Sequence, residues 1–185
     1  MCVSVRPGNY TLMAVEVVAA SLSGNPDVSV EVIEPSRLDL PLPGLAASDD
    51  SVTGLQETVR NATAVVLATP EYHGSFSSVT KLVIENLGFP SVLAGKPIAL
   101  LGVAGGSIGA IKSLEQLRGV CSHVGAIVLP GPVSIAHVRS AFNEDGECTD
   151  PNVEGRLQGL AENLLGYIQS NVCPRMTPEA MVREE

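Results

Sequence analysis

Six consecutive residues, Pro70-Glu-Tyr-His-Gly-Ser75, carry more chemistry than a simple connection needs. They follow an apolar run at 64–68 and precede a segment with helical spacing that begins near Ser77. An ordinary connection needs only one or two turn residues. Here a glycine allows close approach of the backbone to a ligand, and Tyr72 and His73 offer flat rings. We therefore expect a binding site at this loop.

His73 and Glu71 each allow a chemical and a structural interpretation. A general base must lie within reach of the proton that it takes, and the sequence identifies no such proton for His73. Glu71, directly after Pro70, is equally consistent with an anchor for the turn. The loop therefore predicts binding more strongly than acid–base catalysis.

A second loop with chemical potential runs from Ser4 to Thr11 and opens an expected helix. The N-terminus of a helix attracts anions through unpaired N–H groups and the helix dipole, and Arg6 adds a positive charge. An ordinary turn capped by Asn9 or Thr11 explains the same residues. The phosphate-loop pattern G-x-x-x-x-G-K-[ST] and the pattern G-x-G-x-x-G are absent. The loop indicates either an anion site or a plain helix cap.

A third loop, 104–109, is rich in glycine, and its backbone N–H groups suit the polar edge of a planar ring. It also contains Gly105-Gly-Ser-Ile-Gly109, which matches the G-x-S-x-G nucleophile elbow of serine hydrolases. In that fold the acid follows the serine and the histidine follows the acid. After Ser107 the only histidines are His123 and His137; both aspartates come later still, and Glu115 lies on the adjoining expected helix. This order disfavours a hydrolase.

Strands and helices must position these loops, and the apolar pattern predicts that the two alternate. Nearly continuous apolar runs are typical of strands covered on both faces. Alternation with helices implies a parallel sheet that has helices on both faces. We expect strands at 1–5, 28–33, 64–68, 97–103 and 126–129, and helices at 10–22, 52–60, 77–87, 108–121 and 153–168.

Five parallel strands commonly take the order 2-1-3-4-5, and ligands then bind where the order reverses, beyond the carboxyl ends of the strands. The loops 4–11, 69–76 and 104–107 converge there. The first expected strand is short by roughly half, because a typical strand has about five or six residues and Ser4 already belongs to a loop. We expect the recorded start to lie downstream of the true one, with a stunted first strand as the alternative.

The composition is that of a folded protein, with 45% hydrophobic and 17% charged residues among 185. We expect one domain, 1–171, followed by a tail, 172–185. No apolar run approaches the roughly 20 residues of a membrane span, and no basic tract offsets the net charge of −9. Together these features predict a soluble cytoplasmic protein that binds neither membranes nor nucleic acid. The cysteines form no C-x-x-C pair, which gives zinc or redox motifs little support and favours free thiols: Cys2, Cys121, Cys148 and Cys173.

The motifs resemble those of the flavodoxin-like NAD(P)H-dependent FMN reductases, a family that includes quinone, chromate and azo-dye reductases. Pro70-Glu-Tyr-His-Gly-Ser75 is similar to the family's P-E-Y-[NH]-G-S flavin loop, and this is the specific match. Ser4-x-Arg6-Pro-Gly-x-x-Thr11 is similar to its G-S-x-R-x-x-S phosphate loop, with Val3 in place of the glycine. Gly105-Gly is similar to its third loop, and the resemblance extends to at least residue 135.

The resemblance implies a three-layer sandwich of the flavodoxin type that binds FMN. Hydride would pass from NADPH or NADH through the flavin to another flavin, a quinone or a similar acceptor, so no catalytic side chain is required. Two groups of residues are implied. The phosphate would be held by Ser4, Arg6, Asn9 and Thr11, and the isoalloxazine would be bordered by Pro70, Glu71, Tyr72, His73 and Gly74, with Gly105 and Gly106 on its other edge.

The family's usual homodimer or homotetramer buries the helix after the flavin loop, to which Val79, Val83 and Leu87 would contribute. Core packing explains these residues equally well. A flavodoxin-like electron carrier or a regulator without NAD(P)H turnover is the alternative function. Steady-state oxidation of NAD(P)H separates the two classes.

Overall fold

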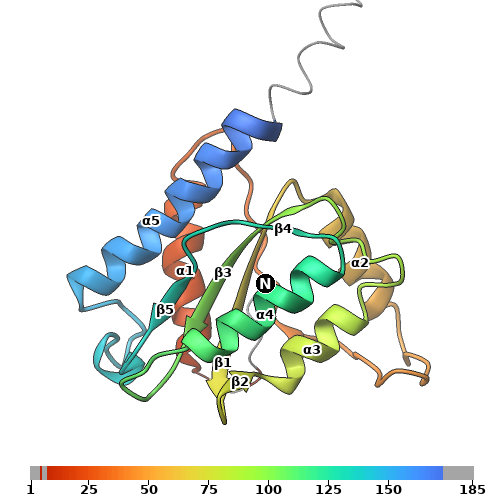
Figure 1. Cartoon of the computed structure of the whole chain (residues 1–185), viewed down its shortest axis with the longest axis horizontal. Helices are drawn as coiled ribbons and strands as arrows, with labels where there is room; N and C mark the ends of the chain where they lie inside the picture. Colours follow the sequence, from red (N-terminus) through yellow and green to blue (C-terminus); the bar gives the residue numbers. More distant parts are fainter. Residues whose placement is uncertain (1–4, 6–7, 173–185) are drawn as a thin grey trace, which may run out of the picture.

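Figure 1 shows the computed structural model of the chain, in which residues 5 and 8–172 are described. A central sheet separates two layers of helices. Helices α1 and α5 pack side by side on one face, whereas α2, α3 and α4 cover the other. The helices are α1 (Tyr10–Ser23), α2 (Ser51–Asn61), α3 (Ser78–Glu85), α4 (Ile111–His123) and α5 (Pro151–Tyr167), with short turns at Pro35–Arg37, Val138–Ser140 and Ile168–Val172.

The sheet is built around β3 (Pro97–Val103), every residue of which is buried. On one side β3 pairs in parallel with β1 (Val65–Tyr72), and on the other with β4 (Ile127–Val128) and β5 (Val133–Ile135). The short strand β2 (Ser75–Phe76) pairs antiparallel with the end of β1. The three-layer α/β architecture predicted from the sequence is confirmed.

Two details of the sheet differ from the prediction. The sheet is mixed, because β2 turns back on β1 as an antiparallel hairpin. The last predicted strand, 126–129, is shortened to β4, and β5 forms within the predicted loop, after the segment 129–132, which contains Pro130 and Pro132. Proline has no N–H to donate to a ladder, so it interrupts a strand at the edge of a sheet.

The predicted strand at 28–33 is not formed in the structure. Val28 and Ile33 pack against the two cores, but Val30 and Val32 between them are 36% and 38% exposed. An alternating pattern becomes a strand only where a neighbouring strand accepts its hydrogen bonds, and none of the described strands pairs with this segment. The alternating pattern at 28–33 was therefore insufficient to predict a strand.

Three predictions concern the ends of elements. The expected first strand, 1–5, and its short length fall almost entirely outside the described residues. The division at 171/172 stays a prediction, because a π-helical turn continues from α5 to Val172 and residues 173–185 are not described. Helix α4 begins at Ile111, three residues later than predicted, because Gly109 adopts a φ of 72° that no helix accommodates.

Two hydrophobic cores fill the spaces between the layers. One lies under α1 and α5 and includes Ala14, Leu101 and Leu157, each fully buried. The other lies under α2, α3 and α4 and includes Leu67 and Leu100. Among residues 5 and 8–172, no helix is both long and apolar enough to cross a lipid bilayer.

Candidate functional site

The loop that carries the most specific motif is a tight hairpin at the carboxyl end of β1. Tyr72 pairs with Ser75, which leaves His73 and Gly74 as the two turn residues. Their φ angles are 53° and 77°, and a type I′ hairpin turn requires positive φ at both central positions. Histidine and asparagine tolerate this region better than most residues do, and glycine adopts it freely. The motif therefore encodes the turn itself.

Helix α4 holds this hairpin through side-chain hydrogen bonds. Nε2 of Gln116 donates to the carbonyl oxygen of Gly74 at 3.0 Å, while its Oε1 accepts from the hydroxyl of Ser75 at 2.7 Å. The backbone N–H of Ser113 donates to a carboxylate oxygen of Glu71 at 3.3 Å. Glu71 therefore anchors the turn, which is the structural one of the two interpretations that the sequence allowed. Gln116 was missed, because nothing in its local sequence marks a contact 42 residues away.

A buried network of hydroxyl groups fixes the base of the same hairpin. Oγ1 of Thr69 lies 2.8 Å from Oγ1 of Thr80, which in turn lies 2.9 Å from Oγ of Ser77. The N–H of Ser77 also donates to Thr69 Oγ1 at 3.2 Å. These three side chains are at most 4% exposed, so the network holds both ends of the loop in place.

A cavity of about 560 Å³ opens beside the hairpin. Its volume lies within the range of about 300–1,000 Å³ that is typical of sites for small molecules and cofactors. Three of the predicted site residues line it. The other predicted site residues in the described part of the chain do not: Asn9, Thr11, Glu71, Gly74, Gly105 and Gly106. The lining consists of Val5, Pro70, Tyr72, His73, Phe76, Ser77, Ser78 and Val79.

The glycine-rich loop presents its backbone to solvent. The carbonyl oxygens of Ala104 and Gly106 accept from the N–H groups of Val138 and His137, at 3.1 and 3.2 Å. The N–H groups of residues 105–108, by contrast, donate to no backbone acceptor within the described part of the chain. A Cβ on Gly105 or Gly106 would meet no atom within 4 Å. Hydrogen bonds to its carbonyl oxygens therefore hold the loop in place, and its N–H groups at 105–108 are available as donors to a ligand, as predicted.

Asn9 and Thr11 lie at the start of α1. Oδ1 of Asn9 accepts from the N–H of Leu12 at 2.8 Å, so Asn9 is the helix cap that the sequence allowed. Thr11 is 1% exposed. Ser4 and Arg6 lie outside the described residues, and their predicted contact with a phosphate stays a prediction.

Ser107 lacks the setting of a hydrolase nucleophile. A nucleophile elbow places its serine on a strained turn with a histidine in reach. Ser107 does not lie on such a turn, because positive φ occurs only at His73 and His137 among the described non-glycine residues. Within the described part of the chain, no hydrogen bond joins the Ser107 hydroxyl to a histidine side chain. The structure therefore gives no support to the hydrolase alternative.

The described thiols belong to the scaffold. Cys121 is fully buried in the core below α4, and burial raises the pKa of its thiol from 9.0 to about 12. Burial also raises the pKa of Cys148, which lies near Asp150. A raised pKa keeps a thiol protonated and unreactive.

Comparison with known proteins identifies the family. The family model of NADPH-dependent FMN reductases matches residues 1–140, and the chain belongs to this family. An NADPH azoreductase of Bacillus sp. (strain OY1-2) is 35% identical over 118 residues, which cover 64% of this chain and 66% of the azoreductase. An NAD(P)H-dependent FMN reductase of Pseudomonas aeruginosa is 28% identical over 171 residues, which cover 90% of this chain and 91% of that reductase.

Solved structures confirm the flavodoxin-like fold. FerB, an NAD(P)H:acceptor oxidoreductase flavoenzyme from Paracoccus denitrificans, superposes with a TM-score of 0.75 at 25% identity, over 90% of this chain and 93% of FerB. A flavodoxin from the domain Archaea shares the fold with a TM-score of 0.61 at 11% identity, over 89% of this chain and 94% of the flavodoxin. The predicted order of the third, fourth and fifth strands corresponds to β1, β3 and β4.

Proposed function

We propose that this protein is an FMN-dependent reductase that takes hydride from NAD(P)H and reduces flavins, quinones, azo compounds or similar small acceptors. The observation that carries the proposal is the motif Pro70–Ser75, which forms a fixed hairpin beside a cavity of about 560 Å³ in a chain of the FMN reductase family. The relatives that are named azoreductase and FMN reductase support the choice of acceptor class.

The residues of the site suit FMN. Tyr72, His73 and Phe76 provide flat side chains on the cavity wall, and residues 105–108 provide backbone donors for a polar ring edge. The N-terminus of α1 would hold the phosphate, together with Ser4, Arg6, Asn9 and Thr11.

Bound FMN supplies two-electron chemistry between a nicotinamide and an acceptor. The chain has to hold the flavin in place and leave one side of it accessible. Glu71, Gln116 and the hydroxyl network supply the first requirement, because they hold the hairpin from two directions. Tyr72, which lines the cavity, is 42% exposed.

The deciding experiment is steady-state oxidation of NADPH and NADH by the FMN-loaded protein, with a quinone, free flavin or an azo dye as acceptor. We expect turnover with at least one acceptor. Bound FMN without turnover would identify an electron carrier or regulator instead. Ser107→Ala should leave turnover intact, whereas an esterase activity lost with Ser107 would favour the hydrolase.

The phosphate assignment has its own test. Arg6→Ala should weaken FMN far more than riboflavin, because only FMN carries the phosphate. Equal loss for both ligands would exclude the assignment of this loop.

We also propose a cytoplasmic homodimer or homotetramer that binds neither nucleic acid nor membranes, as the net charge of −9 favours. The proposed interface needs surfaces other than Val83 and Leu87, which are 1% and 0% exposed and belong to the core of the subunit. Light scattering coupled to gel filtration measures the assembly directly.

A further inference from the structure

Residues 134–148, which we call the bridging segment, contact both the glycine-rich loop and the start of α1. The segment includes most of β5 and the turn Val138–Ser140, and it ends shortly before α5. In Figure 1 it is coloured teal to light blue and lies at the end of the sheet to which the arrow of β3 points. None of its residues is among the predicted cofactor-binding residues.

The first part of the bridging segment holds both ends of the glycine-rich loop. The N–H of Ala104 donates to the carbonyl oxygen of Ile135 at 2.9 Å. The N–H of Ala110 donates to Oγ of Ser134 at 2.8 Å. Two further N–H groups of the segment donate to carbonyl oxygens of the same loop. The direction in which the loop presents its own N–H groups therefore depends on this part of the segment.

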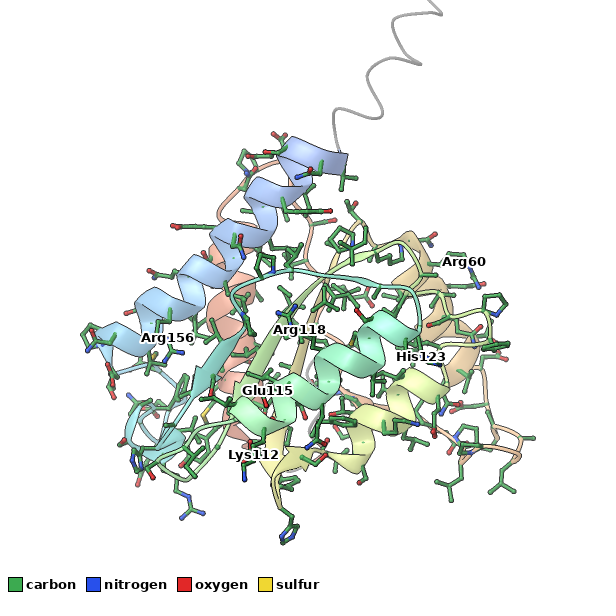
Figure 2. All side chains as sticks on the ribbon, viewed as in Figure 1. Arg60, Lys112, Glu115, Arg118, His123 and Arg156 are labelled. Atoms are coloured by element: carbon green, nitrogen blue, oxygen red, sulfur yellow. The ribbon has the colours of Figure 1, made fainter. Side chains whose placement is uncertain are left out.

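Helix α5 fixes the same part of the segment in place. Nη2 of Arg156 donates to the carbonyl oxygen of Ser134 at 2.8 Å, and Figure 2 shows Arg156 on α5 beside β5. A Cβ on Gly109 would lie 2.5 Å from Oγ of Ser134, so the loop and the segment are packed as closely as a glycine allows. The glycine-rich loop therefore rests on a fixed support.

The second part of the bridging segment is a small hairpin with hydrogen bonds of its own. Phe142 and Cys148 form an antiparallel bridge. The backbone N–H of Asn143 donates to the carbonyl oxygen of Glu147 at 3.0 Å. The side-chain amide of Asn143 donates to the carboxylate of Glu147 and accepts from its N–H, both at 2.9 Å. The hairpin therefore has a defined shape.

This hairpin packs against the first turn of α1. The ring centroids of Tyr10 and Phe142 lie 6.3 Å apart, within the range of favourable aromatic pairs. A Cβ on Gly146 would lie 3.6 Å from Cγ of Met13, which is one turn further along the helix. Phe142 is 5% exposed and belongs to the core between the sheet and the helices α1 and α5. The position of the start of α1 therefore depends on the hairpin.

The start of α1 is where the proposed function places the phosphate of FMN. The N–H groups of Tyr10 and Thr11 donate to no acceptor within the described part of the chain. The next two N–H groups of the helix donate to the carbonyl oxygen of Asn9. Unpaired N–H groups at the start of a helix attract anions. Tyr10 thus carries both an N–H group for a phosphate and the ring that packs on Phe142.

The hairpin itself is unsuited to bind a phosphate. Its charged side chains are those of Glu144, Asp145 and Glu147, and all three are exposed carboxylates. Like charges repel, so a phosphate is not held by these groups. The hairpin can therefore contribute to phosphate binding only through the position that it gives to α1.

We propose that the bridging segment sets the position of the two parts of the site that hold FMN relative to one another. Phe142 is the positioning residue for the phosphate, and Ser134 is the positioning residue for the ring. The inference rests on the proposed function. Riboflavin has the same ring as FMN but no phosphate, so the two ends of the segment should affect the two ligands differently.

The test is fluorescence titration of the full-length, flavin-free protein, which measures the dissociation constants of FMN and of riboflavin. Phe142→Leu removes the aromatic contact with Tyr10 and keeps an apolar side chain in the core. It should weaken FMN about fivefold to tenfold and riboflavin less than twofold. A variant that was only less stable would weaken both ligands by the same factor or neither.

Ser134→Ala should give the opposite pattern. The substitution removes the acceptor for the N–H of Ala110, which holds one end of the glycine-rich loop. FMN and riboflavin should both weaken about threefold to fivefold, because both carry the ring. A loss confined to FMN in this variant would contradict the assignment of Ser134 to the ring.

Asn143→Ala loosens the hairpin without changing the core, so it tests the proposal even if Phe142→Leu fails to fold. FMN should weaken about threefold and riboflavin should be unchanged. Asn163→Ala is the matched control, because Nδ2 of this exposed residue also donates to a carbonyl, that of Pro130 at 2.9 Å, outside the bridging segment. It should leave the affinity for both ligands unchanged.

Turnover of NADPH with a quinone separates this proposal from the proposed function. Wild-type turnover, together with equal losses of FMN and riboflavin or no loss at all in Phe142→Leu and Asn143→Ala, would overturn the role of the bridging segment and leave the reductase standing. A selective loss of FMN in these two variants, without any turnover by the wild type, would support the role of the segment and overturn the proposed function.

Discussion

Gln116 and Gly74 are joined by a hydrogen bond of 3.0 Å from Nε2 of the glutamine to the carbonyl oxygen of the glycine. The bond connects the middle of α4 to the tip of the β1–β2 hairpin. The same amide accepts from Ser75, so both of its ends are used on adjacent residues of one turn. The position of the hairpin therefore depends on the position of α4.

Replacing Gln116 with leucine should loosen the hairpin. We expect the free energy of unfolding to fall by about 1 kcal/mol, since exposed hydrogen bonds contribute little. FMN affinity should fall about fivefold, because the loop must be ordered when the cofactor binds. Gln56→Leu is the matched control, since Gln56 also donates to a carbonyl, that of Asn86 at 2.8 Å, but away from the cavity. It should lower stability alone; a similar loss of FMN affinity in both variants would contradict the role of Gln116.

Substitutions of His73 should change the free energy of unfolding through the backbone conformation of the turn. A β-branched residue at a φ of 53° is strained, so His73→Val should lower the free energy of unfolding by about 1–2 kcal/mol. His73→Gly should stay within about 0.5 kcal/mol of the original, because glycine accepts this region but adds entropy to the unfolded chain. Urea denaturation of the FMN-free protein measures both. An equal loss of the free energy of unfolding in the two variants would show that contacts of the imidazole, and not the conformation of the turn, account for the contribution of His73 to stability.

The sequence predicted those parts of the protein that depend on local patterns. The connection at Pro70–Ser75, the open backbone near Gly105 and all five helices follow from residue types and spacing, whereas the hairpin that the connection forms was not predicted. The strand expected at 28–33 failed, because pairing depends on a neighbouring strand that the pattern itself does not contain. Gln116 and the Thr69–Thr80 contact were missed for the same reason: their partners are distant in sequence, and only the packed fold brings them together.

Cys121 should make the stability of the protein sensitive to alkaline pH. Its pKa is raised to about 12 in the native state, so between pH 9 and 12 the unfolded chain loses this proton while the native chain keeps it. The free energy of unfolding falls as the pH rises through that window. From pH 8 to pH 10 we expect the wild type to lose about 1 kcal/mol more than Cys121→Val, in which this ionisation is absent. Parallel urea titrations at the two pH values measure the difference, and identical losses would contradict it.

Gly102 determines how closely α4 approaches β3. A Cβ at this position would lie 2.6 Å from Cβ of Ala110 and 3.0 Å from Cγ of Leu114. The first contact is with a side chain that has no rotamer to change, so Gly102→Ala must displace the start of α4. We expect a loss of about 3 kcal/mol in the free energy of unfolding. FMN affinity should fall as well, because Glu71 and Gly74 are held by the same helix.

Gly119→Ala is the matched control on α4. Gly119 lies on the exposed side of this helix, and a Cβ there would meet no atom within 4 Å. Alanine favours a helix over glycine by up to about 1 kcal/mol, so this variant should be slightly more stable and should bind FMN as before. Thermal denaturation and FMN titration of the two variants separate the effect on stability from the effect on FMN affinity. If Gly102→Ala kept its FMN affinity while losing stability, the flavin hairpin would not take its position from α4.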